Sequence, residues 1–137
     1  MSQDRATLQQ LAEARLAEAR SLLTNGMPSG AYYLAGYAIE CALKAVIAAD
    51  FRANEIPDPK YVRDIYTHDL SALLRLAELE QELEAEKKTN PGLYQRWETV
   101  KTWSERARYD VWTAASASAI LDAIDGEEGL LTWLQKR

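Results

Sequence analysis

The segment from Pro28 to about Asp50 is the most apolar part of the chain, and it constrains the fold more than any other segment. Its apolar residues have helical spacing, and a proline such as Pro28 suits the first turn of a helix. Small residues recur along it and allow neighbouring backbones to approach closely: Ala35, Gly36, Ala38, Ala42, Ala45, Ala48 and Ala49. We therefore expect this helix at the centre of a bundle or at a subunit interface, and the sequence leaves both positions open.

The other periodic segments are also helical, because their apolar residues recur at steps of three and four. Long helices are predicted over residues 8–24, 67–89, 93–107 and 117–124, and short ones over 61–66 and 130–135. End signals are Asn25-Gly26, Asn90-Pro91 and a segment that resembles a capping box, Asp125 to Glu128. The predicted fold class is all-α: an up-and-down helical bundle of four to five main helices plus a short carboxyl-terminal helix, in one domain over residues 1–137.

The 137 residues include 16 basic and 21 acidic side chains, a net charge of −5, and 47% of them are hydrophobic. This composition is typical of a soluble domain with a core, and it argues against a disordered tail or a membrane protein. The longest charge-free run, residues 21–39, is interrupted by glycines and polar residues, unlike a spanning helix. We expect no secretory signal, since the first residues, Ser2 to Arg5, are polar. The single cysteine, Cys41, excludes an internal disulfide, so we expect a cytoplasmic protein.

Most enzyme motifs are absent. Gly26 and Gly30 are not followed by Gly-Lys-Ser, which excludes a phosphate-binding loop. One histidine and one cysteine cannot form a Cys/His zinc site, and the glutamates of residues 78–86 spread around a helix. We therefore expect no metal and no cofactor. His68 lies at a helix start, where it is expected to help cap the helix; the alternative is a role as an acid or base.

Charge is unevenly distributed along the second half of the chain. Residues 76–86 hold five acidic side chains and no basic one, whereas residues 87–108 hold six basic side chains against Glu98 and Glu105. Aromatic residues interleave with these bases: Tyr94, Trp97, Trp103 and Tyr109. Such a combination can neutralise phosphates and stack on unpaired bases. The alternative is structural, with tryptophans in the core and bases in weak surface ion pairs.

Glu40 and Lys44 lie four residues apart in the most apolar helix, with the acid first, which is the order that favours a helical ion pair. Charged residues in such a helix need partners. One interpretation is a structural pair at the edge of the core. The other is that both side chains line a polar pocket facing the helix predicted over residues 93–107.

Three segments together resemble the HEPN domain family, and the likeness extends from about Leu8 to Leu134. They are Ala31–Lys44 with its Ala-Ile-Glu-x-x-x-Lys pattern, Thr67–Leu70 with His-Asp-Leu, and the tryptophan-rich segment Trp97–Tyr109 ending in Arg-Tyr. The resemblance implies a helical bundle, often paired into a dimer. It also implies occurrence beside or fused to nucleotidyltransferases, and in toxin-antitoxin and other nucleic-acid-directed systems.

Many members of that family are metal-independent ribonucleases, and their motif is an arginine followed after four to six residues by a histidine. The resemblance implies that these two residues meet across a dimer to bind phosphate and transfer protons. The required places after Arg106 and Arg108 fall on residues 111–115, which contain no histidine. Because histidine is the usual acid or base near neutral pH, its absence predicts a site that binds without cutting.

We therefore predict a non-catalytic binding module that recognises a nucleotide, RNA or a protein partner such as a nucleotidyltransferase, and that forms a homodimer. Its candidate binding residues are Arg106, Arg108, Tyr109, Lys44 and Glu40. Arginine offers a planar fork for phosphate oxygens, although both arginines have acidic neighbours with which to pair. Two alternatives stay open: a toxin-like endoribonuclease with His68 as acid or base, and a structural or oligomerising bundle.

Overall fold

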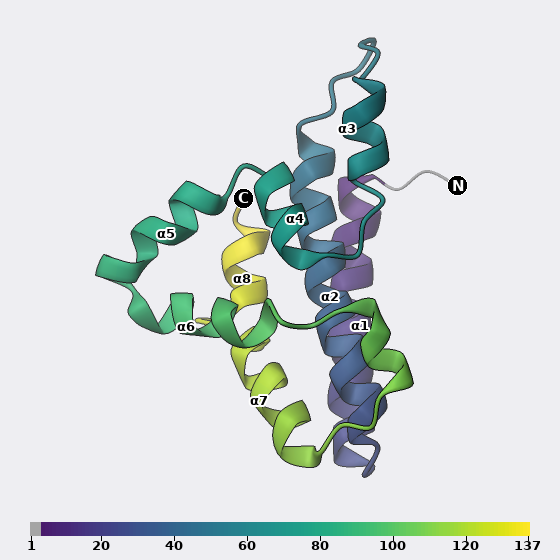
Figure 1. The fold of residues 1–137 in the computed structure, drawn as a ribbon, viewed down its shortest axis with the longest axis vertical. Helices are drawn as coiled ribbons and strands as arrows, with labels where there is room; N and C mark the ends of the chain where they lie inside the picture. The colour runs from purple at the N-terminus through teal and green to yellow at the C-terminus, as the bar shows by residue number, and fades with distance from the viewer. Residues whose placement is uncertain (1–3) are drawn as a thin grey trace.

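Helix α2 (Pro28–Ala49) runs through the middle of the structure, and the other helices are arranged around it (Figure 1). The computed structural model describes residues 4–137. Over these residues it contains eight α-helices, one 3-10 helix and no strand, which confirms the predicted all-α bundle. Of the two positions expected for the apolar helix, the structure shows the centre of the bundle.

By length and composition alone, α2 is apolar enough to cross a membrane. Its most apolar window is 72% buried inside the protein, and the helix carries the charged residues Glu40 and Lys44. A helix that is apolar on nearly all sides is typical of the centre of a bundle, so burial by the surrounding helices accounts for this composition.

Helix α1 (Arg5–Thr24) lies along α2 and joins it through a short turn (Figure 1). The Asp4 carboxylate accepts a hydrogen bond from the Thr7 backbone N–H at 2.8 Å and caps the helix. One stripe of α1 is buried: Leu8, Ala12, Leu16 and Ala19. Asn25 and Gly26 end the helix as predicted, and Gly26 has a φ of +75°, which glycine adopts without strain.

A long connection after α2 contains the short helix α3 (Pro59–Asp64). Asp58 caps α3 by accepting a hydrogen bond from the Lys60 N–H at 2.9 Å, and Pro59 occupies its first position. The ring of Phe51 lies 5.5 Å from the ring of Tyr61 and ties α3 to the end of α2. The short helix predicted over residues 61–66 is therefore present, beginning and ending two residues earlier.

The single helix predicted over residues 67–89 is wrong. The segment forms two helices, α4 (Leu70–Leu76) and α5 (Glu80–Thr89). The chain turns between them at Glu78, which has a left-handed φ of 60°. Leu79 and Leu83 are buried, yet on one continuous helix they would lie on roughly the opposite side from the buried leucines of α4. The turn buries both sets of leucines.

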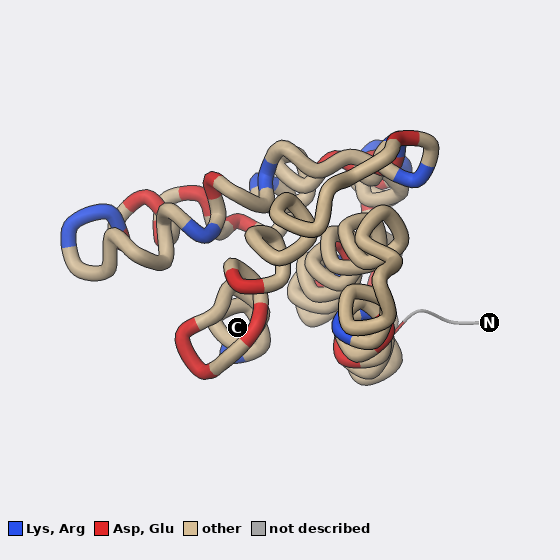
Figure 2. The backbone as a smooth tube through the Cα atoms, turned by 90° about the horizontal axis from the view of Figure 1, so that it is seen from below, with Lys and Arg blue, Asp and Glu red and all other residues tan. Residues whose placement is uncertain are grey.

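Helices α5 and α6 (Pro91–Val100) form a hairpin that projects from the rest of the bundle (Figures 1 and 2). Figure 2 shows acidic residues along α5 and basic residues at the end of the hairpin, where Lys87 and Lys88 occupy the last turn of α5. Leu83 and Trp97, one on each helix, are buried. The hairpin thus carries the acidic run of α5 together with Lys87, Lys88 and Arg96, whereas Arg106 and Arg108 lie beyond it on the segment Glu105–Tyr109.

The helix predicted over residues 93–107 is also interrupted. It ends at Val100, and after a bend the chain forms the 3-10 helix η1 (Glu105–Tyr109). The bend places the indole of Trp103 directly on Gly36, so that a Cβ at position 36 would lie 2.2 Å from the ring. Packing against α2 therefore sets the course of the chain here, and it brings η1 onto the central helix.

Helices α7 (Ala114–Ile124) and α8 (Leu130–Gln135) complete the bundle by packing against α2. Helix α8 matches the predicted residues 130–135, and α7 ends as predicted but begins three residues before the predicted start at residue 117. The predicted capping box does not form. The amino-terminal cap of α8 is Gly129, without a side-chain hydrogen bond, because the helix begins at Leu130, well after Asp125. The Asp125 carboxylate instead accepts from Arg20 of α1 and from the Gly126 N–H.

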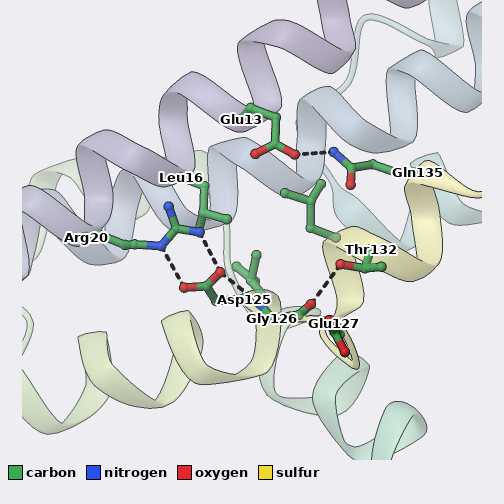
Figure 3. Close-up of a pocket in the computed structure, with 10 residues that line it drawn as sticks. Glu13, Leu16, Arg20, Asp125, Gly126, Glu127, Thr132 and Gln135 are labelled. Atoms are coloured by element: carbon green, nitrogen blue, oxygen red, sulfur yellow. Dashed lines mark hydrogen bonds and ion pairs between the residues drawn. The ribbon is translucent and has the colours of Figure 1, made fainter.

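A pocket of about 280 Å³ lies where α1 meets the turn between α7 and α8 (Figure 3). Its polar side chains bind one another: Arg20 pairs with Asp125, Gln135 donates to Glu13, and the Thr132 hydroxyl donates to the Gly126 carbonyl. The first two bonds hold α1 against the carboxyl-terminal helices, and the third ties α8 to the turn before it, so these side chains are engaged in structural contacts.

Candidate functional site

Glu40 of α2 is the charged residue that the described part of the fold buries, with 3% of its side chain exposed. A buried carboxylate requires hydrogen-bonding partners, and each oxygen of Glu40 has one. Oε2 lies 3.2 Å from Nζ of Lys44, and Oε1 lies 2.9 Å from Nδ1 of His68. The ion pair predicted from the spacing of Glu40 and Lys44 is therefore confirmed, and His68 is a second partner.

His68 does not cap α4, contrary to the sequence-based expectation. Asp69 is the cap, because its Oδ1 atom accepts a hydrogen bond from the Ala72 N–H at 3.1 Å. The Thr67 hydroxyl accepts the Asp69 N–H, also at 3.1 Å, and shapes the turn before the helix. From the turn before α4, the His68 ring contacts α2 on one side and η1 on the other.

Aromatic residues on both sides of η1 hold it against α2. Trp103 packs on Gly36 before η1 begins, and Trp112 stacks on Tyr32 after it ends, with ring centroids 3.7 Å apart. The indole N–H of Trp112 donates to the Ala107 carbonyl at 3.0 Å. Residues three apart lie on the same side of a 3-10 helix, so Glu105 and Arg108 project together from η1.

Glu105 connects His68 to Arg108. Its Oε2 atom lies 3.1 Å from Nε2 of His68, and its Oε1 atom lies 3.5 Å from Nη2 of Arg108. The three side chains are each between a third and a half exposed, in contrast to Glu40 behind them. Solvent therefore reaches His68, Glu105 and Arg108, whereas Glu40 is shielded from it.

Two tyrosines flank the Arg108 guanidinium. The guanidinium lies 4.8 Å from the ring centroid of Tyr109, which is exposed. Tyr33 of α2 is partly buried; burial raises the pKa of its hydroxyl, and the positive charge of Arg108 opposes that rise. Arg108 is thus set between a tyrosine on the central helix and a tyrosine at the surface.

We refer to Lys44, Glu40, His68, Glu105 and Arg108 as the polar cluster. Its imidazole lies between two carboxylates, each of which accepts hydrogen bonds and does not donate them. The Glu40 side of the ring forms a hydrogen bond through Nδ1, and the Glu105 side is an ion-pair contact at Nε2. Basic and acidic side chains therefore alternate along the cluster from Lys44 to Arg108.

The structure brings together five of the six residues selected from the sequence: Glu40, Lys44, His68, Arg108 and Tyr109. Arg106 is exposed on a different side of η1, and within residues 4–137 it joins none of the ion pairs of the cluster. Sequence reasoning missed the bridging role of Glu105 and the position of Tyr33. The three-residue spacing of Glu105 and Arg108 was the available signal for the first.

Residues 7–137 match the model of the HEPN domain family. The chain belongs to the HEPN family. No curated protein and no solved structure matches it. In this HEPN domain the only histidine approaches Arg108 from the turn before α4, through Glu105, although it lies far from Arg108 in the sequence. Among the described residues, no three His, Cys, Asp or Glu side chains are arranged to hold a metal ion.

Proposed function

We propose that this HEPN domain binds a phosphate-bearing ligand, a nucleotide or an RNA, at Arg108 and Tyr109 without cleaving it. The observation that carries the proposal is the exposure of Arg108: 47% of its side chain is accessible, and its contact with Glu105 is long, at 3.5 Å. A guanidinium forms strong paired hydrogen bonds with phosphate oxygens. The exposed ring of Tyr109 beside it offers a surface on which a base can stack.

The environment of His68 supports binding over cleavage. Both ring nitrogens face carboxylates, Glu40 at 2.9 Å and Glu105 at 3.1 Å. A general acid or base must reach the substrate within hydrogen-bond distance, and these two carboxylates occupy both nitrogens of this one. As long as Glu105 keeps its place, His68 holds the site together and does not exchange protons with a substrate.

An endoribonuclease is the second candidate, and one specific contact favours it. His68 and Arg108 bind the same Glu105 carboxylate, so a histidine and an arginine lie at one small site within a single chain. If a substrate displaced Glu105, the Nε2 atom of His68 would face a phosphodiester held by Arg108, and it would be the acid or base.

One gel experiment separates these functions. End-labelled single-stranded RNA is incubated with the protein at low salt without added metal, and native and denaturing gels are run for wild type, Arg108→Ala, His68→Gln and the control Arg75→Ala. Arg75 is an exposed arginine on α4 outside the polar cluster. Retardation without cleavage that is weakened by Arg108→Ala and by added salt supports the binding module.

Other outcomes decide against it. Cleavage that is lost in His68→Gln identifies a ribonuclease, and cleavage that persists in His68→Gln excludes this histidine as its acid or base. If Arg108→Ala and Arg75→Ala retard the RNA equally, the RNA is attracted to basic side chains in general and Arg108 is not a specific binding residue. Retardation by none of the four proteins, together with no binding of free nucleotides, overturns the proposal.

A further inference from the structure

The carboxylate of Glu105 is held between two groups that bind anions. One of its oxygens faces Nε2 of His68 at 3.1 Å, and the other faces the guanidinium of Arg108 at 3.5 Å. Imidazolium and guanidinium groups are common phosphate ligands, and a phosphate presents oxygens that can contact both at once. The protein thus places one of its own carboxylates where a histidine ring and an arginine converge.

The two carboxylates that flank His68 differ in how easily they can be displaced. Glu40 lies behind the ring on α2, has 3% of its side chain exposed, and is also bound by Lys44. Glu105 lies in front of the ring on a short 3-10 helix, with 34% of its side chain exposed. The buried Glu40 therefore fixes the orientation of the imidazole with Nε2 toward Glu105, and Glu105 is the partner that a ligand can replace.

We infer that His68 Nε2 and the Arg108 guanidinium form an anion subsite, which the Glu105 carboxylate occupies until a terminal phosphate of the ligand displaces it. This inference rests on the proposed function, because it uses the same arginine. It adds His68 as a ligand-contacting residue, Glu40 as the residue that positions it, and Glu105 as an internal competitor.

Because a ligand must displace the Glu105 carboxylate, the charge of the ligand determines which class binds. Glu105 contributes a single negative charge, and a phosphodiester within an RNA chain also carries one, so its exchange for Glu105 gains little. A terminal phosphomonoester carries about −1.5 to −2 charges at pH 7 and three acceptor oxygens. A nucleoside monophosphate and the 5′-phosphate of an RNA share this chemistry, and the site favours both over an RNA that ends in a hydroxyl.

Binding is measured with a short single-stranded RNA labelled at its 3′ end and carrying either a 5′-phosphate or a 5′-hydroxyl. The variants are Glu105→Gln, Arg108→Ala and the control Glu98→Gln, which removes the same charge from an acid on α6 that pairs with Lys101 outside the cluster. Glu105→Gln is expected to bind the 5′-phosphate RNA on the order of tenfold more tightly, a ratio that about 1.4 kcal/mol produces. The hydroxyl-ended RNA should change much less, and Glu98→Gln should behave as wild type.

The outcomes separate this inference from the proposed function. If wild type binds, Arg108→Ala does not, and Glu105→Gln improves binding of both RNAs equally or of neither, the binding function stands and the internal competitor is rejected. If wild type and Glu105→Gln both fail to bind any phosphate-bearing probe, both proposals fall. Circular dichroism of each variant establishes that it is folded before binding is compared.

A second measurement uses the fact that the sequence has one histidine, so every imidazole resonance in the NMR spectrum comes from His68. Adenosine monophosphate is titrated into wild type, Glu105→Gln and Arg108→Ala at constant pH. A saturable shift of the Nε2 resonance is expected in wild type, at lower nucleotide concentration in Glu105→Gln, and absent in Arg108→Ala. Binding of the nucleotide without any change at the His68 resonances overturns the inference and leaves Arg108 as the sole anion ligand.

Discussion

The indole ring of Trp103 rests on the backbone of Gly36, and a side chain of even one carbon at position 36 would lie 2.2 Å from that ring. This contact joins the segment before η1 to the middle of α2. Glu105 follows Trp103 by two residues, so the same contact determines where the exposed half of the polar cluster lies relative to Glu40.

Gly36→Ala is expected to destabilise the protein by about 1–3 kcal/mol, the usual effect of adding atoms to a filled core. It should also weaken phosphate binding, because Trp103 must move and η1 with it. Urea unfolding and the binding assay measure the two effects. Gly92→Ala is the matched control, since the nearest atom to a Cβ at Gly92 is 3.8 Å away. Alanine forms helices better than glycine, so Gly92→Ala should not destabilise the protein. A Gly36→Ala protein as stable as Gly92→Ala would show that contact with Trp103 does not restrict position 36.

Removing His68 should cost more stability than removing Glu105. His68→Ala leaves Oε1 of the buried Glu40 without its partner, which costs about 1–3 kcal/mol. Glu105 is one-third exposed and its ion pairs lie at the surface, so Glu105→Ala should cost less than about 1 kcal/mol. The free energy of unfolding in urea gives both values. Equal losses would mean that water or Lys44 satisfies Glu40 when the histidine is absent.

The Arg20–Asp125 ion pair should make a small contribution to stability that depends on pH. The hydrogen bonds from Arg20 lower the pKa of Asp125 below its ordinary value of 3.8. A lowered pKa in the folded state stabilises the protein above the ordinary value, and this stabilisation disappears as the pH falls through the lowered value. Both side chains are partly exposed, so we expect at most about 1 kcal/mol.

Asp125→Asn tests this expectation, with Asp122→Asn, an exposed aspartate on α7, as the control. The urea midpoint of Asp125→Asn should lie below that of wild type near neutral pH. The difference should shrink as the pH is lowered in steps through 3.8 and beyond. A difference that stays constant across this range would assign the effect to the shape of the turn and not to the charge.

Cys41 should be inert toward thiol reagents in the folded protein. The residue is 4% exposed, and burial raises the pKa of its thiol to about 11, so little thiolate forms near neutral pH. A disulfide reagent should therefore react slowly with native protein and rapidly, with one thiol per chain, in denaturant. Fast reaction without denaturant would reveal frequent opening of the bundle at the middle of α2.

Helical spacing and end signals predicted the helices that run straight along the core. Residues 28–50 and the helix ended by Asn25-Gly26 are found nearly as expected, because the apolar pattern of each runs without interruption from end to end. The two helices predicted over residues 67–89 and 93–107 were wrong, because in each segment the side that is buried changes partway along. The turn at Glu78 and the bend before Trp103 are set by packing against other parts of the chain, which local spacing does not contain.

In the candidate site, too, local spacing predicted contacts within one helix but not contacts between distant segments. The spacing of Glu40 and Lys44 was sufficient to predict their contact, since both lie on one helix. The position of His68 beside them depends on a long connection folding back onto α2, and only the family resemblance suggested that these segments belong to one site. Arg106 and Arg108 are both arginines with acidic neighbours in one segment, so the sequence does not distinguish them. The 3-10 helix turns between the two positions, and their side chains therefore project from different sides of η1.

Arg20 and Asp125 are 105 residues apart in a sequence of 137, and their contact closes most of the chain into a loop. Contacts of such long range form late in folding, because the chain must lose much conformational entropy before they can be made. The hairpin of α1 and α2 can assemble first, with its apolar surface uncovered until α7 and α8 arrive. We therefore expect substitutions at this pair to accelerate unfolding with little effect on the folding rate, so that the carboxyl-terminal helices determine how long the native state persists.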